Sequence, residues 1–443
     1  MEAACADTPR DIAHRPSSGS ETMAAVEAWP AEEMEERAGD VAVAAEALLR
    51  RRAAWRHRRV ETLTVLSHEQ VRRAVSVDFT VPAEYRDDLR ISAAEECVVP
   101  LALLAKRPLV HFDLRNEEGH SVPLLTAQQN ALIDRELLYL ALDADLDAQD
   151  AGEAAKTAVS IAAGEVVEAV LRGGAPEGAV ERLEREHGLG PLEDFRAMTA
   201  TLSANFVLWA VTRGIERRRV FKFAYDEPFS QRPGLVHFYD APGVTEAASY
   251  HLEVAVPPDL KARTTSLVDD ATGEVLTTGE RDTDRPALYF AADPARMPVR
   301  PGVTVAYGAE RGRFLAPAAV VATIITLLIA LPLLLADLAA LAGSAGPAIG
   351  LVLSTSAVFS ALVLRTDEHP LLRLVLVRHR VALVVSTLAA LLAAAVLGFQ
   401  ADDWLLRAGW LVAGLVSAAA AAILVMAAVR SPSARSTPAQ PQP

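Results

Sequence analysis

The densest group of side chains that could carry chemistry lies in the segment LVHFDLRNEEGH, residues 109–120. Val110, Phe112 and Leu114 alternate with polar residues, which predicts a strand, and residues 116–119 have turn composition. A hairpin of this kind would bring His111 and Asp113 beside His120. Imidazole nitrogens and carboxylate oxygens are zinc ligands. His111, Asp113 and His120 are therefore the candidate metal ligands of this sequence.

The same segment also has a simpler explanation. Its spacing matches neither HExxH nor a two-histidine-one-carboxylate set. An exposed hairpin with a polar face and an acidic turn needs these residue types, and LVHFYD at 235–240 repeats the pattern with His237 and Asp240. We favour the hairpin interpretation and expect no catalytic residue, no metal ligand and no cofactor.

Other catalytic signals are weak. Cys97 lies beside Glu95 and Glu96, whose charges would raise the pKa of a thiol, which argues against a nucleophile. The sequence contains no GxSxG, no GxxxxGK[ST] and no GxGxxG pattern. Enzymatic activity therefore stays open, with a non-enzymatic role favoured.

Composition divides the chain into two unlike parts. The 443 residues are 51% hydrophobic, with a net charge of -14 and a mean hydropathy of +0.20. Residues 315–443 contain seven arginines, no lysine and five acids, a net charge of +2, so the remainder carries -16. This division indicates a membrane portion attached to a large acidic soluble portion.

Four apolar runs predict transmembrane helices, because about 20 apolar helical residues cross a bilayer core. The four runs are 315–336, 348–364, 381–398 and 408–429. Their polar residues are hydroxyls rather than charges, which is typical of helix packing. We expect two helical hairpins that act as an anchor.

Basic residues indicate the orientation. Arginines precede the first run, fill the link at 365–380 and follow the last run, whereas the other two links contain mainly acids. Residues 1–30 contain no apolar stretch typical of a signal peptide. Both termini and the soluble portion are therefore expected on the cytoplasmic side of the plasma membrane, in a reducing compartment that suits the two cysteines.

The link at 365–380 has two interpretations. Arg373, Arg378 and Arg380 are interleaved with leucine and valine, so the segment could lie in the headgroup layer and contact anionic lipid. Alternatively it extends the third helix, with arginines that reach back to the membrane surface. In both cases these three arginines are the predicted membrane-surface contacts.

Periodicity predicts an α+β soluble portion, with antiparallel β-sandwich-like strands around a helical insertion. Strand patterns cover 60–125, helical patterns cover 126–216 with Thr126 as an N-cap, and six short strands follow within 217–310. The apolar stretch that ends near Val211 is interpreted as a core helix. Residues 1–59 are predicted to be a largely disordered tail ending in a basic helix, and 430–443 a disordered tail.

The predicted soluble portion also contains a cluster of arginines and a pair of similar segments. Arginines at 50–52, 56, 58 and 59 could contact an anionic membrane surface or simply end a solvated helix. The strong acidity around them disfavours nucleic-acid binding. VDFTVPAEYR at 77–86 resembles LEVAVPPDLK at 252–261, which raises the hypothesis of a duplicated β unit.

Three functions remain from the sequence. The favoured one is a multi-pass membrane protein that anchors a cytoplasmic binding or scaffold domain for a protein partner or ligand. The second is a small channel, or a transporter subunit or regulator, built from the four helices, with an oligomer left open. The third is a membrane-bound metal-dependent hydrolase that would use His111, Asp113 and His120.

Overall fold

The computed structural model describes residues 31–67, 69–91, 96–174, 178–228, 230–232, 236–292, 298–334, 369–398 and 403–431, and the structural statements below concern these ranges. The helices are α1 (Ala31–Arg50), α2 (Arg52–Trp55), α3 (Ala127–Ala148), α4 (Glu153–Leu171), α5 (Ala179–His187), α6 (Glu193–Ala204), α7 (Ala316–Leu334), α10 (Pro370–Gly398) and α11 (Asp403–Arg430). Short helical turns are η1 (Ala83–Tyr85), η2 (Pro242–Thr245) and η4 (Arg311–Leu315).

The strands are β1 (Arg56–Val65), β2 (Gln70–Phe79), β3 (Cys97–Ala105), β4 (Val110–Arg115), β5 (Asn205–Thr212), β6 (Arg219–Pro228), β7 (Ser230–Arg232), β8 (Val236–Asp240), β9 (Ser249–Ala255), β10 (Leu260–Asp269), β11 (Glu274–Thr278), β12 (Ala287–Ala291) and β13 (Pro301–Ala309). They form a six-stranded sheet in the order β12-β9-β1-β2-β6-β4, a five-stranded sheet in the order β11-β10-β13-β8-β7, and the pair β3-β5. The large sheet is mixed, because β1 runs parallel to β9 and antiparallel to β2.

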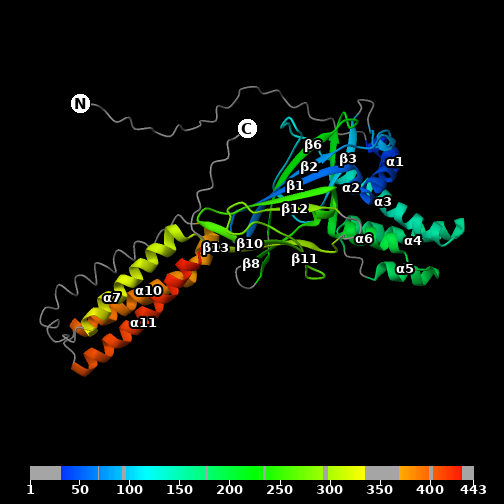
Figure 1. Ribbon diagram of the computed structural model, residues 1–443. Helices are drawn as coiled ribbons and strands as arrows, with labels where there is room; N and C mark the ends of the chain where they lie inside the picture. The colour runs from blue at the N-terminus through cyan, green and yellow to red at the C-terminus, as the bar shows by residue number, and fades with distance from the viewer. Residues whose placement is uncertain are drawn as a thin grey trace, which may run out of the picture.

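The predicted α+β class is confirmed at this level. Figure 1 shows the sheets in the middle of the molecule, with α3 to α6 at one end and α7, α10 and α11 at the other. The two large sheets share one apolar cluster, which includes Tyr250 and Leu252 of β9 with Val303 and Val305 of β13. A second cluster joins β2 and β6 to the helices and to β3 and β5.

Alternating residues explain the strands. In β2, Val75, Val77 and Phe79 are buried while Ser76 and Asp78 are not, as the period-two pattern predicts. Phe79 packs edge-on between Trp55 and Phe221, with ring centroids 5.4 Å apart in both pairs. Aromatic packing of this kind fixes the β1 to β2 to β6 layer against the helices.

Thr126 begins α3 as predicted. Its hydroxyl accepts a hydrogen bond from the Gln129 backbone N–H at 3.3 Å, and the Gln129 side chain accepts one from the Thr126 N–H at 2.9 Å. This capping box satisfies backbone donors that the first turn leaves without partners.

Two boundaries differ from the predictions. Residues 31–50 form α1, whose Val41, Ala42 and Leu48 lie in the helical core, so the part of the 1–59 tail that the structure describes is packed. The predicted core helix ending near Val211 stops at Ala204, and β5 follows. β3 offers an antiparallel partner there, and the residues from Phe206 to Val211 that favour strands pair with it.

The two similar segments, 77–86 and 252–261, do not have equivalent strand pairing. β9 pairs directly with β12, whereas β6 separates β2 from β4. The two segments therefore occupy different positions in one sheet, which gives the duplication hypothesis no structural support.

The C-terminal helices form a bundle in which α11 runs opposite to the other two. The Ser417 hydroxyl lies 3.1 Å from that of Ser386, and the Trp410 indole donates to the Ala393 carbonyl at 3.1 Å. Thr326 lies 2.9 Å from Ser417 in the same way. Since α7 and α10 both run antiparallel to α11, they run parallel to each other, and both begin at the sheets (Figure 1).

Helix α10 belongs to both parts of the molecule. Leu371, Leu372, Val375 and Leu376 in its first turns are at most 6% exposed and join the cluster shared by the two sheets. His369, just before the helix, contacts the Val65 carbonyl of β1 at 3.2 Å through its Nε2. The rest of α10 packs along α7 and α11. The sheets and the bundle therefore share a continuous apolar core.

Two described helices are long and apolar enough to cross a membrane, at Pro370–Val396 and Trp404–Arg430. A third, Ala316–Leu331, is apolar but shorter. The predicted span at 348–364 lies outside the described residues. Two candidate spans are thus found where the sequence predicted four.

The shared core makes a testable prediction. Leu376→Ala should lower the melting temperature of the full chain in lipid nanodiscs by about 5 °C or more, because a buried leucine truncation costs about 2–5 kcal/mol. Val377→Ala is the matched control, since Val377 is 49% exposed. Equal melting of the two variants would contradict the packing of α10 on the sheets.

Candidate functional site

The most unusual feature of the interior is a row of charged side chains between the sheets. Arg59 and Glu61 of β1, Arg73 of β2 and Glu227 of β6 are each at most 7% exposed. Glu246, which follows η2, is 2% exposed. Buried charges are tolerated only when they are paired and hydrogen-bonded. These five residues, with Arg52, Arg56 and Arg107, are here called the buried ion-pair network.

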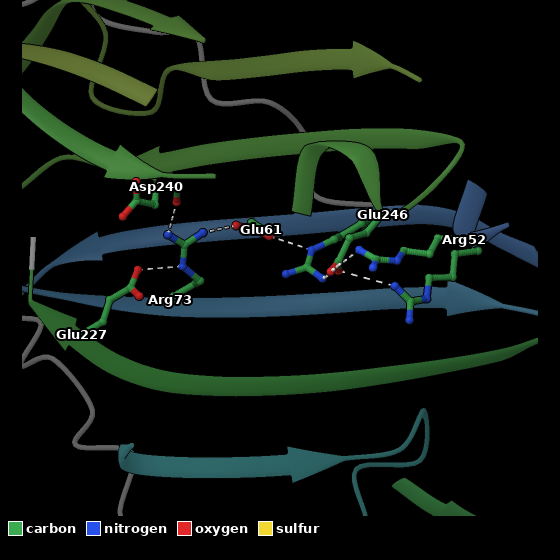
Figure 2. A network of polar contacts seen from close by, with 8 residues as sticks. Arg52, Glu61, Arg73, Glu227, Asp240 and Glu246 are labelled. Carbon is green, nitrogen blue, oxygen red and sulfur yellow. Dashed lines mark hydrogen bonds and ion pairs between the residues drawn. The ribbon is translucent and has the colours of Figure 1, made fainter. Parts of the chain in front are cut away.

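Glu61 and Arg73 are its centre (Figure 2). Glu61 accepts a hydrogen bond from Arg59 at 2.6 Å and another from Arg73. Arg73 donates in turn to Glu227 at 2.7 Å and to the Asp240 carbonyl of β8 at 2.6 Å. Because β8 belongs to the five-stranded sheet, Arg73 joins the two sheets directly.

Glu246 lies at the other end of the network, where three arginines surround it. Arg59 donates to it, and Arg52 and Arg56 lie 3.6 Å and 3.5 Å away. Arg56 also donates to the Pro100 carbonyl at 2.7 Å, while its Nε and Nη1 have no hydrogen-bond acceptor. Arg107 pairs with Glu227 at the opposite end. Five arginines thus face three glutamates, which leaves two positive charges unbalanced among the described residues.

The titration behaviour of the network follows from this arrangement. Burial alone would raise the pKa of Glu61, but Arg59 and Arg73 outweigh it, and the pKa is lowered. Burial lowers the pKa of Arg56 to about 10, and Arg52 and Arg59 add to this effect against the attraction of Glu246. Arg56 is therefore less well neutralised than Arg59, whose pKa is raised by Glu61 and Glu246.

The backbone is closely fitted to these ion pairs at Gly243. A Cβ atom placed there would lie 2.2 Å from the Arg59 Nε and 2.4 Å from a Glu61 carboxylate oxygen. Only glycine lets the η2 turn approach so closely. Since Glu61, Glu227 and Glu246 are all paired with arginines, the network is suited to fixing the sheets and to balancing charge.

A cavity of about 310 Å³ adjoins the Arg52 end of the network, between α1, α3, α6 and the β3-β5 pair. A shallower hollow of about 200 Å³ lies on the opposite, outer face of the large sheet, between β1, β2, β6 and β4. The first is the larger and the more enclosed of the two, so it is the better candidate for a ligand site.

The three candidate metal ligands do not converge. His111 lies 2.6 Å from Asp226, Asp113 pairs with Arg115 at 2.7 Å, and His120 lies 3.2 Å from Glu118. The described residues contain no group of three or more histidine, cysteine or acidic side chains placed to hold a metal ion. β4 pairs with β6, and the return of the predicted hairpin is reduced to isolated bridges at Ser121 and Leu124.

The basic block at 50–59 is divided between the interior and the surface. Arg56 and Arg59 are buried, whereas Arg50, Arg51 and Arg58 are exposed, and Arg50 pairs with Glu46 and with Asp194. Cys97, the other chemical candidate, is buried at the start of β3.

The link arginines lie on α10 itself, since the helix begins at Pro370. Arg373 and Arg378 are exposed, and the Arg380 guanidinium lies 5.7 Å from the centre of the Phe314 ring. The leucines and valines between them contact the sheets, so the apolar face of this segment packs on protein. The structure thus favours the helix-extension interpretation.

One buried carboxyl group stands apart from the network. Asp134 on α3 is 6% exposed and its Oδ1 has no hydrogen-bond partner. Burial raises its pKa to about 7, which the attraction of Lys106 reduces only in part. Perturbed carboxyl groups are common in active sites, but Asp134 lines neither of the two cavities described above.

Comparison with protein families, with characterised proteins and with solved structures finds no match to this chain. Function therefore has to be argued from the geometry alone.

The network predicts a large cost for removing its central charge. Glu61→Gln should lower the free energy of unfolding by about 3–5 kcal/mol, because Arg59 and Arg73 lose a buried counter-charge. The lowered pKa of Glu61 means that its contribution is present above its ordinary value of 4.5 and is lost as the pH falls through the lowered value. Chemical denaturation followed by tryptophan fluorescence measures both effects.

Glu253→Gln is the matched control, because Glu253 forms an exposed pair with Arg285 at 3.7 Å. An exposed pair contributes less than about 1 kcal/mol. A Glu61→Gln effect as small as this control would show that the network does not hold the sheets.

Asp134 predicts a pH dependence of the opposite sign. Its raised pKa means that the folded chain holds the proton more tightly than the unfolded chain. The stability this provides is complete below the unfolded value of 3.8 and is lost as the pH rises through about 7. Asp134→Asn should therefore raise the melting temperature more at about pH 8 than at about pH 5. Equal gains at the two pH values would contradict the buried, protonated carboxyl group.

Proposed function

We propose that this chain is a multi-pass membrane protein that carries a β-sandwich-like binding domain on the cytoplasmic face of the plasma membrane. The observation that carries the proposal is helix α10. Its first turns lie in the core of the sheets, and its remainder continues into a bundle whose outer surface is aliphatic. A bundle in water would need a polar outer face.

The outer surface of the bundle supports lipid as its solvent. On α7, the residues facing outward at helical spacing are Val320, Ile324, Leu327 and Leu331, which are 47–62% exposed. In the most apolar stretch of each helix, only 39% of α10 and 33% of α11 is buried inside the protein. Large contiguous apolar surfaces of this kind mark contacts with membranes or partners.

Connectivity supports a fourth crossing. Because α7 and α10 run in the same direction, Leu334 and Pro370 lie at opposite ends of the bundle. If the bundle crosses the bilayer, the chain between them has to cross it too. The apolar run at 348–364 lies in that part of the sequence, and we propose it as the fourth span.

Charge supports the orientation. Arg311 before α7, Arg373 and Arg378 at the start of α10, and Arg430 at the end of α11 are exposed at the end of the bundle next to the sheets. Basic residues of this kind favour the cytoplasmic side. Arg373, Arg378 and Arg380 are accordingly assigned to the membrane surface, where anionic lipid is their counter-charge.

Hydroxyl pairing in the bundle supports anchoring over conduction. Ser417 hydrogen-bonds to both Thr326 and Ser386, and the two serines have no exposed surface. Hydroxyls that satisfy each other hold helices together and line no pore. The dispersed partners of His111, Asp113 and His120 likewise give no support to a metal-dependent hydrolase.

Thiol labelling tests the arrangement in intact cells, in a background with Cys5→Ser and Cys97→Ser. A membrane-impermeant maleimide should react from outside with Leu334→Cys and Trp404→Cys. Pro370→Cys and Arg430→Cys at the other end should react only after the cells are permeabilised. Labelling of Leu334→Cys and Pro370→Cys from the same side would remove the fourth crossing, and outside labelling of Arg430→Cys would reverse the orientation.

A further inference from the structure

The cavity between α1, α3 and α6 has mainly apolar walls. Its large aliphatic lining residues are Leu49 of α1, Leu103 of β3, Leu137 of α3, Met198 and Leu202 of α6, and Val207 of β5. A volume of about 310 Å³ lies at the lower end of the range for small-molecule sites. Methionine is a side chain that adapts its shape to a ligand. The apolar part of a small molecule therefore fits here.

The charged residues that line the cavity are not equally neutralised. Arg50 pairs with both Glu46 and Asp194, so these three side chains satisfy each other. Arg52 differs, because it donates to the Leu49 carbonyl at 2.8 Å and its ion pair with Glu246 is 3.6 Å long. Arg52 is also 28% exposed, which leaves its guanidinium accessible from the cavity.

The deficit of negative charge in the network lies at this same place. Glu246 is shared by Arg52, Arg56 and Arg59, and Arg56 retains two nitrogen atoms without acceptors although it is 1% exposed. Buried positive charge without a counter-charge is costly. Arg52 is the member through which an anion in the cavity can supply that counter-charge.

We propose that this cavity binds a small amphipathic anion, with a single carboxylate paired to Arg52 and an apolar body between α1, α3 and α6. The proposal rests on the proposed function as a binding domain and names the class of its ligand. Guanidinium and carboxylate form strong, charge-assisted hydrogen bonds. A cationic ligand is disfavoured because both acids of the lining are already paired with Arg50.

Octanoate is the test probe, with octanamide as its neutral analogue. The full chain in lipid nanodiscs is titrated by calorimetry, and empty nanodiscs are titrated in parallel to subtract partition into lipid. Octanoate should bind with a finite stoichiometry and at least about tenfold more tightly than octanamide. Arg52→Gln should weaken octanoate by about tenfold or more and leave octanamide unchanged. Arg51→Gln, at the exposed neighbouring arginine, should leave both unchanged.

A second variant keeps the test sharp if Arg52→Gln is unstable. Ala197 lines the cavity and is exposed, so Ala197→Trp should fill the space and abolish octanoate binding without changing the melting temperature. Equal binding of octanoate and octanamide, or octanoate binding that survives both Arg52→Gln and Ala197→Trp, would overturn the assignment. So would an absence of octanoate binding to the wild-type chain.

The proposed ligand class and the proposed membrane arrangement can be rejected independently. Thiol labelling as expected together with no octanoate binding removes the ligand class and leaves the anchored domain. Octanoate binding that depends on Arg52, in a chain whose thiols report another topology, keeps this site and removes the membrane arrangement.

Discussion

Glu61 has no exposed surface, and the rest of the sheet region depends on keeping that carboxylate paired. Its partners come from its own strand, Arg59, and from the neighbouring strand, Arg73. They meet only in the observed register, in which Glu61 lies opposite Val75 and Leu63 opposite Arg73. A slip by one residue would turn Arg73 to the outer face and leave Glu61 buried alone. Since an apolar replacement of a buried ion pair is often as stable, what these charges contribute is the selection of one pairing.

The same selection extends to the second sheet and to the C-terminal helices. Arg73 reaches the Asp240 carbonyl of β8, β8 pairs with β13, and β13 contacts the start of α10. Each step is a direct contact, and interiors packed at this density do not deform smoothly. The tilt of α10 therefore cannot change without repacking Leu371, Leu372 and Leu376 against the sheets. A bundle attached through a loose linker would move independently of the sheets, and the packing of α10 on the sheets rules out that form of attachment.

The sequence patterns predicted most strands and the Thr126 cap because local periodicity and capping are properties of neighbouring residues. They failed where a distant partner decided the outcome. The stretch after Ala204 became β5 because β3 was there to pair with it, and α1 is ordered by contacts with α3. The sequence contains a signal for the ion-pair network that a search for apolar patterns alone does not detect. Arg73 is in phase with Val71 and Val75, and Glu227 is in phase with Phe223 and Tyr225. A charge on the buried phase of a strand predicts a buried partner, but not which one, and Glu246 comes from a loop with no periodicity at all.

The proposed ligand site is positively charged, whereas the chain as a whole is negatively charged. Residues 1–314 carry -16, so at long range the molecule repels an anion. Among the described residues, however, the network holds two unbalanced positive charges. Salt screens the outer charge beyond about 8–10 Å, whereas Arg52 and Arg56 act at contact distance in a medium that screens far less. An anion with no apolar body would feel the repulsion and gain little on arrival, because Arg52 is partly solvated. An amphipathic anion gains apolar burial against Leu137 and Met198 as well, which offsets the approach cost. The arrangement therefore discriminates by apolar content as well as by charge, and it predicts that free phosphate or chloride competes poorly for the site that octanoate occupies.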